Sequence, residues 1–181
     1  MGCGKSRTGR MLSERCGLPF MDLDSFIVRE LHMTIPAIFK LRGEEYFRDE
    51  ETRCLQKLSE YRTMCYSGGQ RTLVPRVYNK GHVIALGGGT PLRPENVAVM
   101  REHGVCFYIN TPFELCYERI RGDGNRPVAA GSTKEELFAR FNLRAPFYRA
   151  AADFVINGGS AVADYVVGEI MEFLPTIKRM G

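Results

Sequence analysis

The sequence predicts an α/β fold in three layers, with helices on both faces of a parallel sheet. Short runs that are apolar throughout, such as residues 82–86 and 105–109, alternate with longer segments whose apolar residues recur at helical spacing. Strands of this kind are typical of parallel sheets that are buried on both faces. No repeat or linker interrupts the alternation, and 181 residues suit one core. We therefore expect residues 1–181 to form a single domain.

The sequence of the first half of the chain predicts one strand and several helices. Residues 6–14 form a helix that carries Met11 and Leu12, and Gly17 ends it. A short strand at 18–23 follows and ends in Asp22-Leu23-Asp24. Three more helices are predicted, at 25–31, from the N-cap Thr34 to about Leu41, and, after a break at Gly43, from Glu44 to about Arg62.

The second half begins with an irregular stretch and then becomes regular. Residues 64–80 contain a glycine pair and Pro75, which indicates an insertion holding a short strand or hairpin. Thr111 and Ser132 each begin a predicted capping box, and the polar, Gly-rich loop 122–131 lies between the two helices. The expected strands are 82–86, 105–109 and 154–156, and the expected helices are 94–103, 111–120, 132 to near Pro146, and one capped by Ser160.

Composition and charge narrow the classes of function. The net charge is +4, and the basic residues are spread along the chain, so we expect no nucleic-acid partner and a small anionic substrate fits better. No apolar run is long enough to span a bilayer, so no membrane partner is expected. The six cysteines form no C-x-x-C pair, which favours reduced thiols in a cytoplasmic protein. We expect this protein to be a monomer.

The chain begins inside a phosphate-binding loop. Met1-Gly2-Cys3-Gly4-Lys5-Ser6 is the back half of the pattern G-x-x-x-x-G-K-[ST]. In the full motif, backbone N–H groups surround the phosphates of a nucleotide, the lysine reaches the β- and γ-phosphates, and the serine hydroxyl binds Mg²⁺. Lys5 and Ser6 are therefore candidates for these two roles. Such a loop normally follows a buried strand, and that strand is not among these residues.

Further motifs follow the loop in a fixed order. They are Asp22-Leu23-Asp24, Gly43-Glu44-Glu45-Tyr46-Phe47-Arg48-Asp49-Glu50-Glu51, Gly87-Gly88-Gly89-Thr90-Pro91, Arg126-Pro127, and Arg144-Ala145-Pro146-Phe147-Tyr148. With the loop, this ordered set resembles shikimate kinase, a family of small P-loop enzymes similar to nucleoside monophosphate kinases. The resemblance implies phosphorylation of shikimate to shikimate 3-phosphate by ATP with Mg²⁺, in the pathway to chorismate and aromatic amino acids. It also implies a five-stranded parallel sheet of order 2-3-1-4-5, whose first strand is absent from this sequence.

The resemblance assigns one group of residues to ATP and the metal ion. Asp22 ends a strand beside the phosphate loop, where with Ser6 it would hold Mg²⁺, the carboxylate through water. Arg126, in a lid at about 122–134, would approach the γ-phosphate when the lid closes. Arg119 matches an arginine that stacks on adenine. The loop residues that would contact ATP are Gly2, Cys3, Gly4, Lys5, Ser6 and Arg7, the last in place of the usual threonine.

A second group is assigned to shikimate. Asp24 matches the aspartate that binds substrate hydroxyls and helps to take the proton from the attacking one. Arg48 and Arg144 match the arginines that hold the substrate carboxylate, which suits the planar, two-pronged guanidinium group. Glu51 lies one helical turn beyond Arg48 and would orient it. The backbone of Gly87, Gly88 and Gly89 would approach the substrate ring where side chains would collide.

Two other functions and one structural question stay open at this point. A related small-molecule kinase, such as one for gluconate, would keep Lys5, Ser6 and the lid arginine but would not need Arg48 and Arg144. A non-catalytic binding or regulatory protein of the same fold is the other alternative. The insertion exceeds the usual family length by about fifteen residues. Because an open place in the middle of the sheet is costly, we expect residues upstream of this sequence, or a segment such as 71–78, to fill it. Pro75 disfavours the latter, so the expectation is upstream residues or else a chain that is unstable as written.

Overall fold

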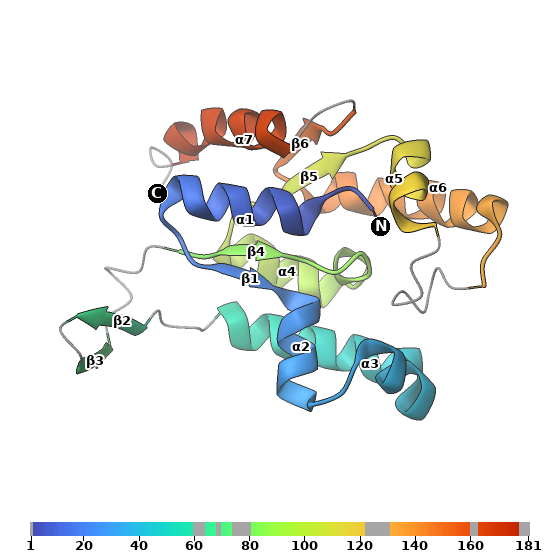
Figure 1. The fold of residues 1–181 in the computed structure, drawn as a ribbon, viewed down its shortest axis with the longest axis horizontal. Coiled ribbons are helices and arrows are strands. Elements are labelled where there is room, and N and C mark those ends of the chain that lie inside the picture. The colour runs from blue at the N-terminus through green and yellow to red at the C-terminus, as the bar shows by residue number, and fades with distance from the viewer. Residues whose placement is uncertain are drawn as a thin grey trace.

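Helices and strands alternate along the chain as the sequence predicts. The computed structural model describes residues 2–59, 64–67, 70–73, 81–121, 131–159 and 163–177 (Figure 1). The strands are β1 (Phe20–Asp22), β2 (Met64–Ser67), β3 (Gln70–Leu73), β4 (Val83–Ala85), β5 (Phe107–Asn110) and β6 (Phe154–Asn157). The helices are α1 (Lys5–Cys16), α2 (Leu23–Leu31), α3 (Ile35–Ser59), the 3₁₀ turn η2 (Thr90–Leu92), α4 (Pro94–His103), α5 (Phe113–Ile120), α6 (Lys134–Ala151) and α7 (Ala163–Ile177).

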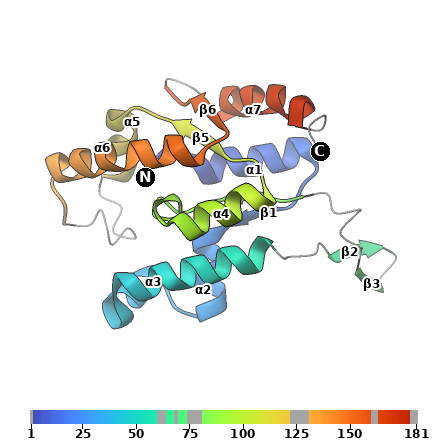
Figure 2. The same cartoon turned by 180° about the vertical axis from the view of Figure 1, so that it is seen from behind.

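The described strands of the sheet form two parallel pairs. β1 lies beside β4, with Asp22 opposite Ala85, and β5 lies beside β6. In Figures 1 and 2, β4 and β5 are the inner strands of the two pairs. These pairs are the neighbours that the order 2-3-1-4-5 requires on either side of its central strand, and the complete five-stranded order stays a prediction. Because β1 and β4 run in the same direction, Asp22 and the glycines after β4 reach the same edge of the sheet.

The insertion forms an antiparallel hairpin in its described part. Met64 pairs with Leu73 and Ser67 pairs with Gln70, so β2 and β3 satisfy each other's backbone groups. Neither strand pairs with β4 or β5, and the hairpin projects from one end of the molecule (Figure 1). The alternative that residues 71–78 fill the middle of the sheet is therefore wrong for 71–73; residues 74–80 lie outside the described part of the chain.

Two hydrophobic clusters lie on opposite faces of the strands. Val83 packs with α1 and α7, whereas the next residue, Ile84, packs with α2, α3 and α4. This change of side is what the two-residue period of a strand requires, and the layers can be followed in Figures 1 and 2. A third, smaller cluster joins α5 to α6. The three-layer α/β fold is thus as expected, and in the described residues no helix is long and apolar enough to cross a membrane.

Most helix boundaries agree with the sequence analysis, and three do not. Thr111 makes no capping bond to α5; its hydroxyl lies 3.5 Å from the Cys3 carbonyl oxygen instead. The capping box of α6 is formed by Thr133 and Glu136, one residue later than expected. Helix α6 also continues through Pro146 to Ala151, because packing of its last turns outweighs the hydrogen bond that a proline removes. Gly43 breaks α3 as predicted, with φ 84° and ψ 172°.

Candidate active site

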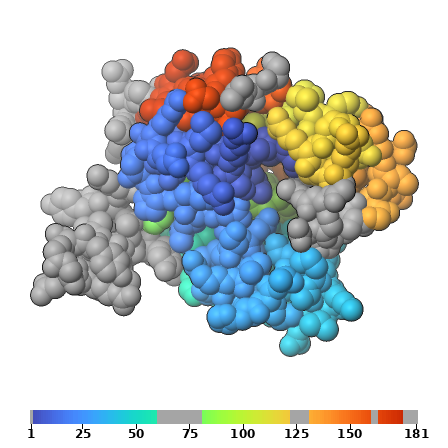
Figure 3. All heavy atoms as spheres, viewed as in Figure 1, coloured from blue at the N-terminus to red at the C-terminus, as the bar shows by residue number. Residues whose placement is uncertain are grey.

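The phosphate loop leads directly into the N-terminus of α1. Gly4 adopts a left-handed conformation with φ 87°, and Lys5 and Ser6 open the helix. The first N–H groups of a helix have no partners within it, and together with the helix dipole they favour an anion. The first turn of α1 contains no acidic residue, and atoms of the N-terminal segment (dark blue) are visible on the face seen in Figure 3. This geometry can receive the phosphates of a nucleotide.

The two predicted metal-binding residues lie together. The Ser6 hydroxyl donates a hydrogen bond of 2.6 Å to Oδ2 of Asp22. The other oxygen of Asp22, Oδ1, accepts the backbone N–H of Ser25 at 3.2 Å and so caps α2. A hydroxyl and a carboxylate are hard oxygen donors, which suit Mg²⁺, and an ion that keeps most of its water needs only one or two such ligands.

Asp24 is affected by charged groups of both the phosphate loop and α3. Burial raises the pKa of Asp24, the charge of Lys5 lowers it, and the nearby carboxylates of Asp22 and Glu51 raise it again. The charge of Arg48 also lowers the pKa of this carboxyl group. The net direction is upward. A carboxylate with a raised pKa is a stronger base, so the position suits proton abstraction next to two cations.

Arg48 is held by two carboxylates of its own helix. Nη1 lies 2.9 Å from Oε2 of Glu51, and Nη2 lies 2.9 Å from Oε1 of Glu44. Burial alone would lower the pKa of Arg48, but the ion pairs with Glu51 and Glu44 raise it, so the guanidinium group stays charged. Its side chain is only 13% exposed, and that of Glu51 is fully buried. The predicted i, i+3 contact between Arg48 and Glu51 is therefore present.

The three glycines after β4 let these side chains approach the backbone. A Cβ atom on Gly89 would collide with the Arg48 guanidinium group, and one on Gly87 would collide with Glu51 and stand 3.1 Å from Oδ1 of Asp24. Gly88 accepts a hydrogen bond of 2.6 Å at its carbonyl from the Tyr148 hydroxyl. The glycine segment thus makes room for the side chains of Glu51, Asp24 and Arg48.

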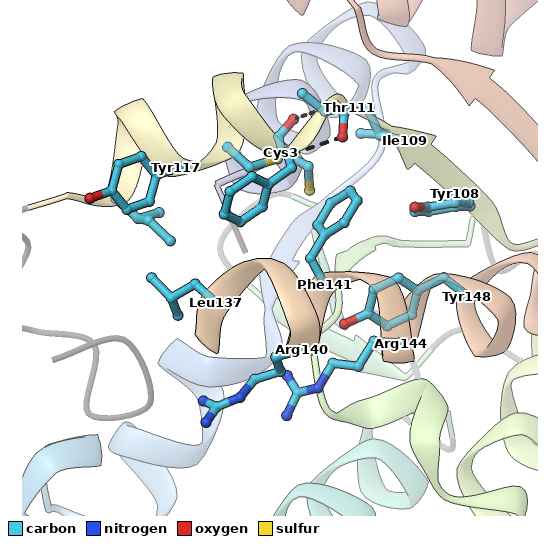
Figure 4. Close-up of a pocket in the computed structure, with 13 residues that line it drawn as sticks. Cys3, Tyr108, Ile109, Thr111, Tyr117, Leu137, Arg140, Phe141, Arg144 and Tyr148 are labelled. Carbon is cyan, nitrogen blue, oxygen red and sulfur yellow. Dashed lines mark hydrogen bonds between the residues drawn. The ribbon is translucent and has the colours of Figure 1, made fainter. Parts of the chain in front are cut away.

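Arg144 approaches this region from α6. It lies one helical turn before Tyr148. Burial raises the pKa of Tyr148 above its ordinary value, although the charge of Arg144 and a hydrogen bond from it oppose this rise. Both residues line a pocket between β5, α5 and α6, which also includes Cys3 of the phosphate loop (Figure 4). Residues on this pocket thus connect the phosphate loop with the second predicted carboxylate-binding arginine.

Tyr148 is a site residue for which the sequence analysis assigned no role. We expect Tyr148→Phe to raise the KM for the acceptor substrate several-fold, because the glycine segment loses the hydrogen bond at Gly88 while the ring packing is kept. Steady-state kinetics at saturating nucleotide measures this, and Tyr165→Phe, an exposed hydroxyl on α7 that bonds to Glu169, is the matched control. Unchanged acceptor KM in Tyr148→Phe would refute the role.

The remaining predicted residues have varied positions. Arg119 donates a hydrogen bond of 3.1 Å to the Gly2 carbonyl, so it contacts the phosphate loop itself. Arg7 is exposed in the first turn of α1. Arg126 and lid residues 122–130 lie outside the described part of the chain. The structure therefore brings together Ser6 with Asp22, and Asp24 with Lys5, Arg48 and Glu51.

Comparisons with known proteins show which family this chain is similar to. The profile of the family described as shikimate kinase matches residues 1–76 and 69–175. A shikimate kinase of Caldicellulosiruptor bescii is 33% identical over 158 residues, 87% of this chain and 81% of that protein, and one of Ralstonia nicotianae is 35% identical over 175 residues, 94% of this chain and 81% of that protein.

Solved structures show the same relationship at the level of the fold. The shikimate kinase of Acinetobacter baumannii in complex with shikimate superposes with a TM-score of 0.83 and 31% identity, over 98% of this chain and 90% of that chain. The shikimate kinase of Aquifex aeolicus superposes with a TM-score of 0.77 and 30% identity, over all of this chain and 95% of that chain. With a family profile that covers most of its length and relatives above 30% identity, this chain belongs to the shikimate kinase family.

Proposed function

We propose that this protein transfers the γ-phosphoryl group of ATP to a hydroxyl group of shikimate, giving ADP and shikimate 3-phosphate. One observation carries the proposal: the carboxyl group of Asp24 lies within the electrostatic reach of both Lys5 and Arg48. The proposed phosphate-binding cation and the proposed carboxylate-binding cation therefore both act on the proposed base. A substrate that carries both a carboxylate and a hydroxyl group fits this arrangement.

In the proposed mechanism, Asp24 accepts the proton of the attacking hydroxyl group as its oxygen bonds to the γ-phosphorus atom. The bond between that phosphorus and the leaving oxygen of ADP breaks, and Lys5 and the N-terminus of α1 stabilise the charge on the phosphates. Arg48 and Arg144 hold the shikimate carboxylate, so that the hydroxyl group faces the phosphate loop. Arg126 would add a further positive charge from the lid.

Mg²⁺ is the proposed cofactor, and Ser6 and Asp22 would hold it. The ion would neutralise phosphate charge. The free thiols Cys3, Cys16, Cys54, Cys106 and Cys116 support the proposed cytoplasmic location, since reduced cysteines are typical of that compartment. We also propose that the protein acts as a monomer, which light scattering after gel filtration would test.

A coupled assay of ADP release tests the proposed function. We expect turnover that requires shikimate, ATP and Mg²⁺ together. Gluconate as the preferred acceptor would favour the related small-molecule kinase instead, since such an enzyme would not need Arg48 and Arg144. Shikimate binding without ADP release would favour the non-catalytic alternative.

Replacement of Arg48 by lysine tests the choice of substrate. We expect the KM for shikimate to rise by about tenfold, because an ammonium group cannot make the paired hydrogen bonds of a guanidinium group. The KM for ATP should stay within twofold, and Arg144→Lys should behave in the same way. Arg53→Lys is the matched control, since Arg53 lies on the same helix, half-exposed, and pairs with Glu50. An equal rise in the KM for ATP would show that Arg48 does not bind the carboxylate of shikimate.

A further inference from the structure

We propose that Thr90 and Asn96 are positioning residues of the substrate site, which hold the Glu51 carboxylate and through it the Arg48 guanidinium group. The inference rests on the proposed function and deepens it, since it concerns how the carboxylate-binding arginine is oriented. Neither residue needs to touch the substrate to act in this way.

The first link joins Thr90 to Glu51. The Thr90 hydroxyl donates a hydrogen bond of 2.6 Å to Oε1 of Glu51, while Arg48 donates to Oε2 at 2.9 Å. Each carboxylate oxygen therefore has its own partner, and the group cannot rotate without breaking one of the two bonds. Because Glu51 and Thr90 are fully buried, water does not replace a lost partner. The orientation of Arg48 thus depends on Thr90, 39 residues from Glu51 in the sequence.

The second link joins Asn96 to Thr90. Nδ2 of Asn96, in the first turn of α4, donates a hydrogen bond of 3.0 Å to the Thr90 carbonyl. The side chain of Asn96 is fully buried, and its Oδ1 has no hydrogen-bond partner among the described residues. An apolar residue at this position would avoid the free-energy cost of burying an oxygen without a hydrogen-bond partner. Among the described residues, the bond that the side-chain amide makes is the one that fixes the turn bearing Thr90.

A purely structural tie between α3 and the turn before α4 does not account for these buried groups. Arg93 already joins the same elements from the outside, with Nη1 2.8 Å from Oδ1 of Asp49 and Nη2 2.5 Å from Oε1 of Glu45. The two helices pack side by side on the face seen in Figure 2. The buried bonds end at Glu51 and therefore at Arg48, which is what a positioning role requires.

The position of Gly89 supports the same conclusion. The Arg48 guanidinium group lies so close to Gly89 that a Cβ atom there would overlap it, and Thr90 is the next residue. A shift of Thr90 would therefore move the surface on which the guanidinium group rests. Thr90 acts on Arg48 by two routes, through Glu51 and through the backbone of Gly89.

A pair of threonine variants tests the inference. Thr90→Val removes the hydroxyl group at nearly constant volume, and Thr90→Ser keeps it. We expect the valine variant to raise the KM for shikimate by about tenfold, with the KM for ATP within twofold of wild type, and the serine variant to remain near wild type. Thr52→Val is the matched control, because the bond that the Thr52 hydroxyl makes among the described residues is to the Arg48 carbonyl of its own helix, at 3.1 Å.

A double-mutant cycle shows whether Thr90 acts through Glu51. In a Glu51→Gln background, Thr90→Val should raise the KM for shikimate much less than it does in wild type, since the carboxylate it holds is gone. Full additivity would overturn the proposed link. A serine variant as defective as the valine variant, or a shikimate KM unchanged in Thr90→Val, would also overturn it.

Asn96→Ala reports on the same contacts without changing Thr90. We expect a several-fold rise in the KM for shikimate and no change for ATP, and thermal melting identifies any variant that is not folded. If Thr90→Val does not fold, an unchanged shikimate KM in Asn96→Ala refutes the inference. Wild-type protein that does not phosphorylate shikimate would instead refute the proposed function, and the inference with it.

Discussion

Replacing Asp24 by asparagine is expected to lower kcat by about 10²–10⁴-fold, the usual contribution of a positioned general base. Asparagine keeps the size of the side chain but cannot accept the proton of the attacking hydroxyl group. The structure supports this role, because Asp24 lies near Lys5 and Arg48 and burial raises its pKa. Single-turnover kinetics with saturating ATP and shikimate would measure the chemical step directly.

The pH dependence of wild-type enzyme gives an independent check on Asp24. Only its ionised form can take the proton, so kcat/KM should fall as the pH decreases through the pKa of Asp24, which lies above its ordinary value of 3.8. The acidic limb of the profile should be absent in Asp24→Asn. Asp164→Asn, at an exposed position on α7, is the control and should retain wild-type turnover. Wild-type-like turnover in Asp24→Asn would exclude Asp24 as the base.

Replacing Lys5 by methionine is expected to lower kcat by about 10²–10³-fold, as the loss of one donor to a developing charge does elsewhere. Methionine has a similar length but no charge, so the phosphates would lose a cation at the start of α1. Because that charge is strongest in the transition state, kcat should fall more than ATP affinity. Calorimetric titration of ATP together with steady-state turnover separates the two effects.

Two outcomes would contradict the role of Lys5. One is a kcat near that of wild type in Lys5→Met, and the other is a loss of ATP affinity that accounts for the whole defect. Lys40→Met, at an exposed position on α3, tests whether loss of any lysine is harmful and should have little effect.

The predicted secondary structure was most accurate where local signals are strong. Gly17 ends α1 in a left-handed conformation, and Gly43 breaks α3, because glycine adopts such backbone angles without strain. Thr34 accepts the N–H of Ala37 and starts α3 as expected. These signals depend on residues within a few positions of one another, so they are visible in the sequence.

The errors arose where distant contacts outweigh local preference. Thr111 looks like a helix cap, but its hydroxyl faces the phosphate loop, which comes from the other end of the chain. Pro146 looks like a helix end, but α6 continues because Tyr148 bonds Gly88 and Ala151 lies in the core. Local rules cannot anticipate such cases, because the compensating energy comes from tertiary packing.

The sequence by itself determined the family, the order of the motifs and the candidate chemistry of Lys5, Asp24 and Arg48. Glycines and charged residues at the ends of strands mark such sites because ligands bind at that edge of a parallel sheet. Only the tertiary structure decided which partners hold these groups: Ser6 with Asp22, Tyr148 with Gly88, and Thr90 with Glu51. These pairs are separated by 16, 60 and 39 residues, and a contact across such a distance leaves no periodic pattern in the chain, because it forms only when separate elements pack together.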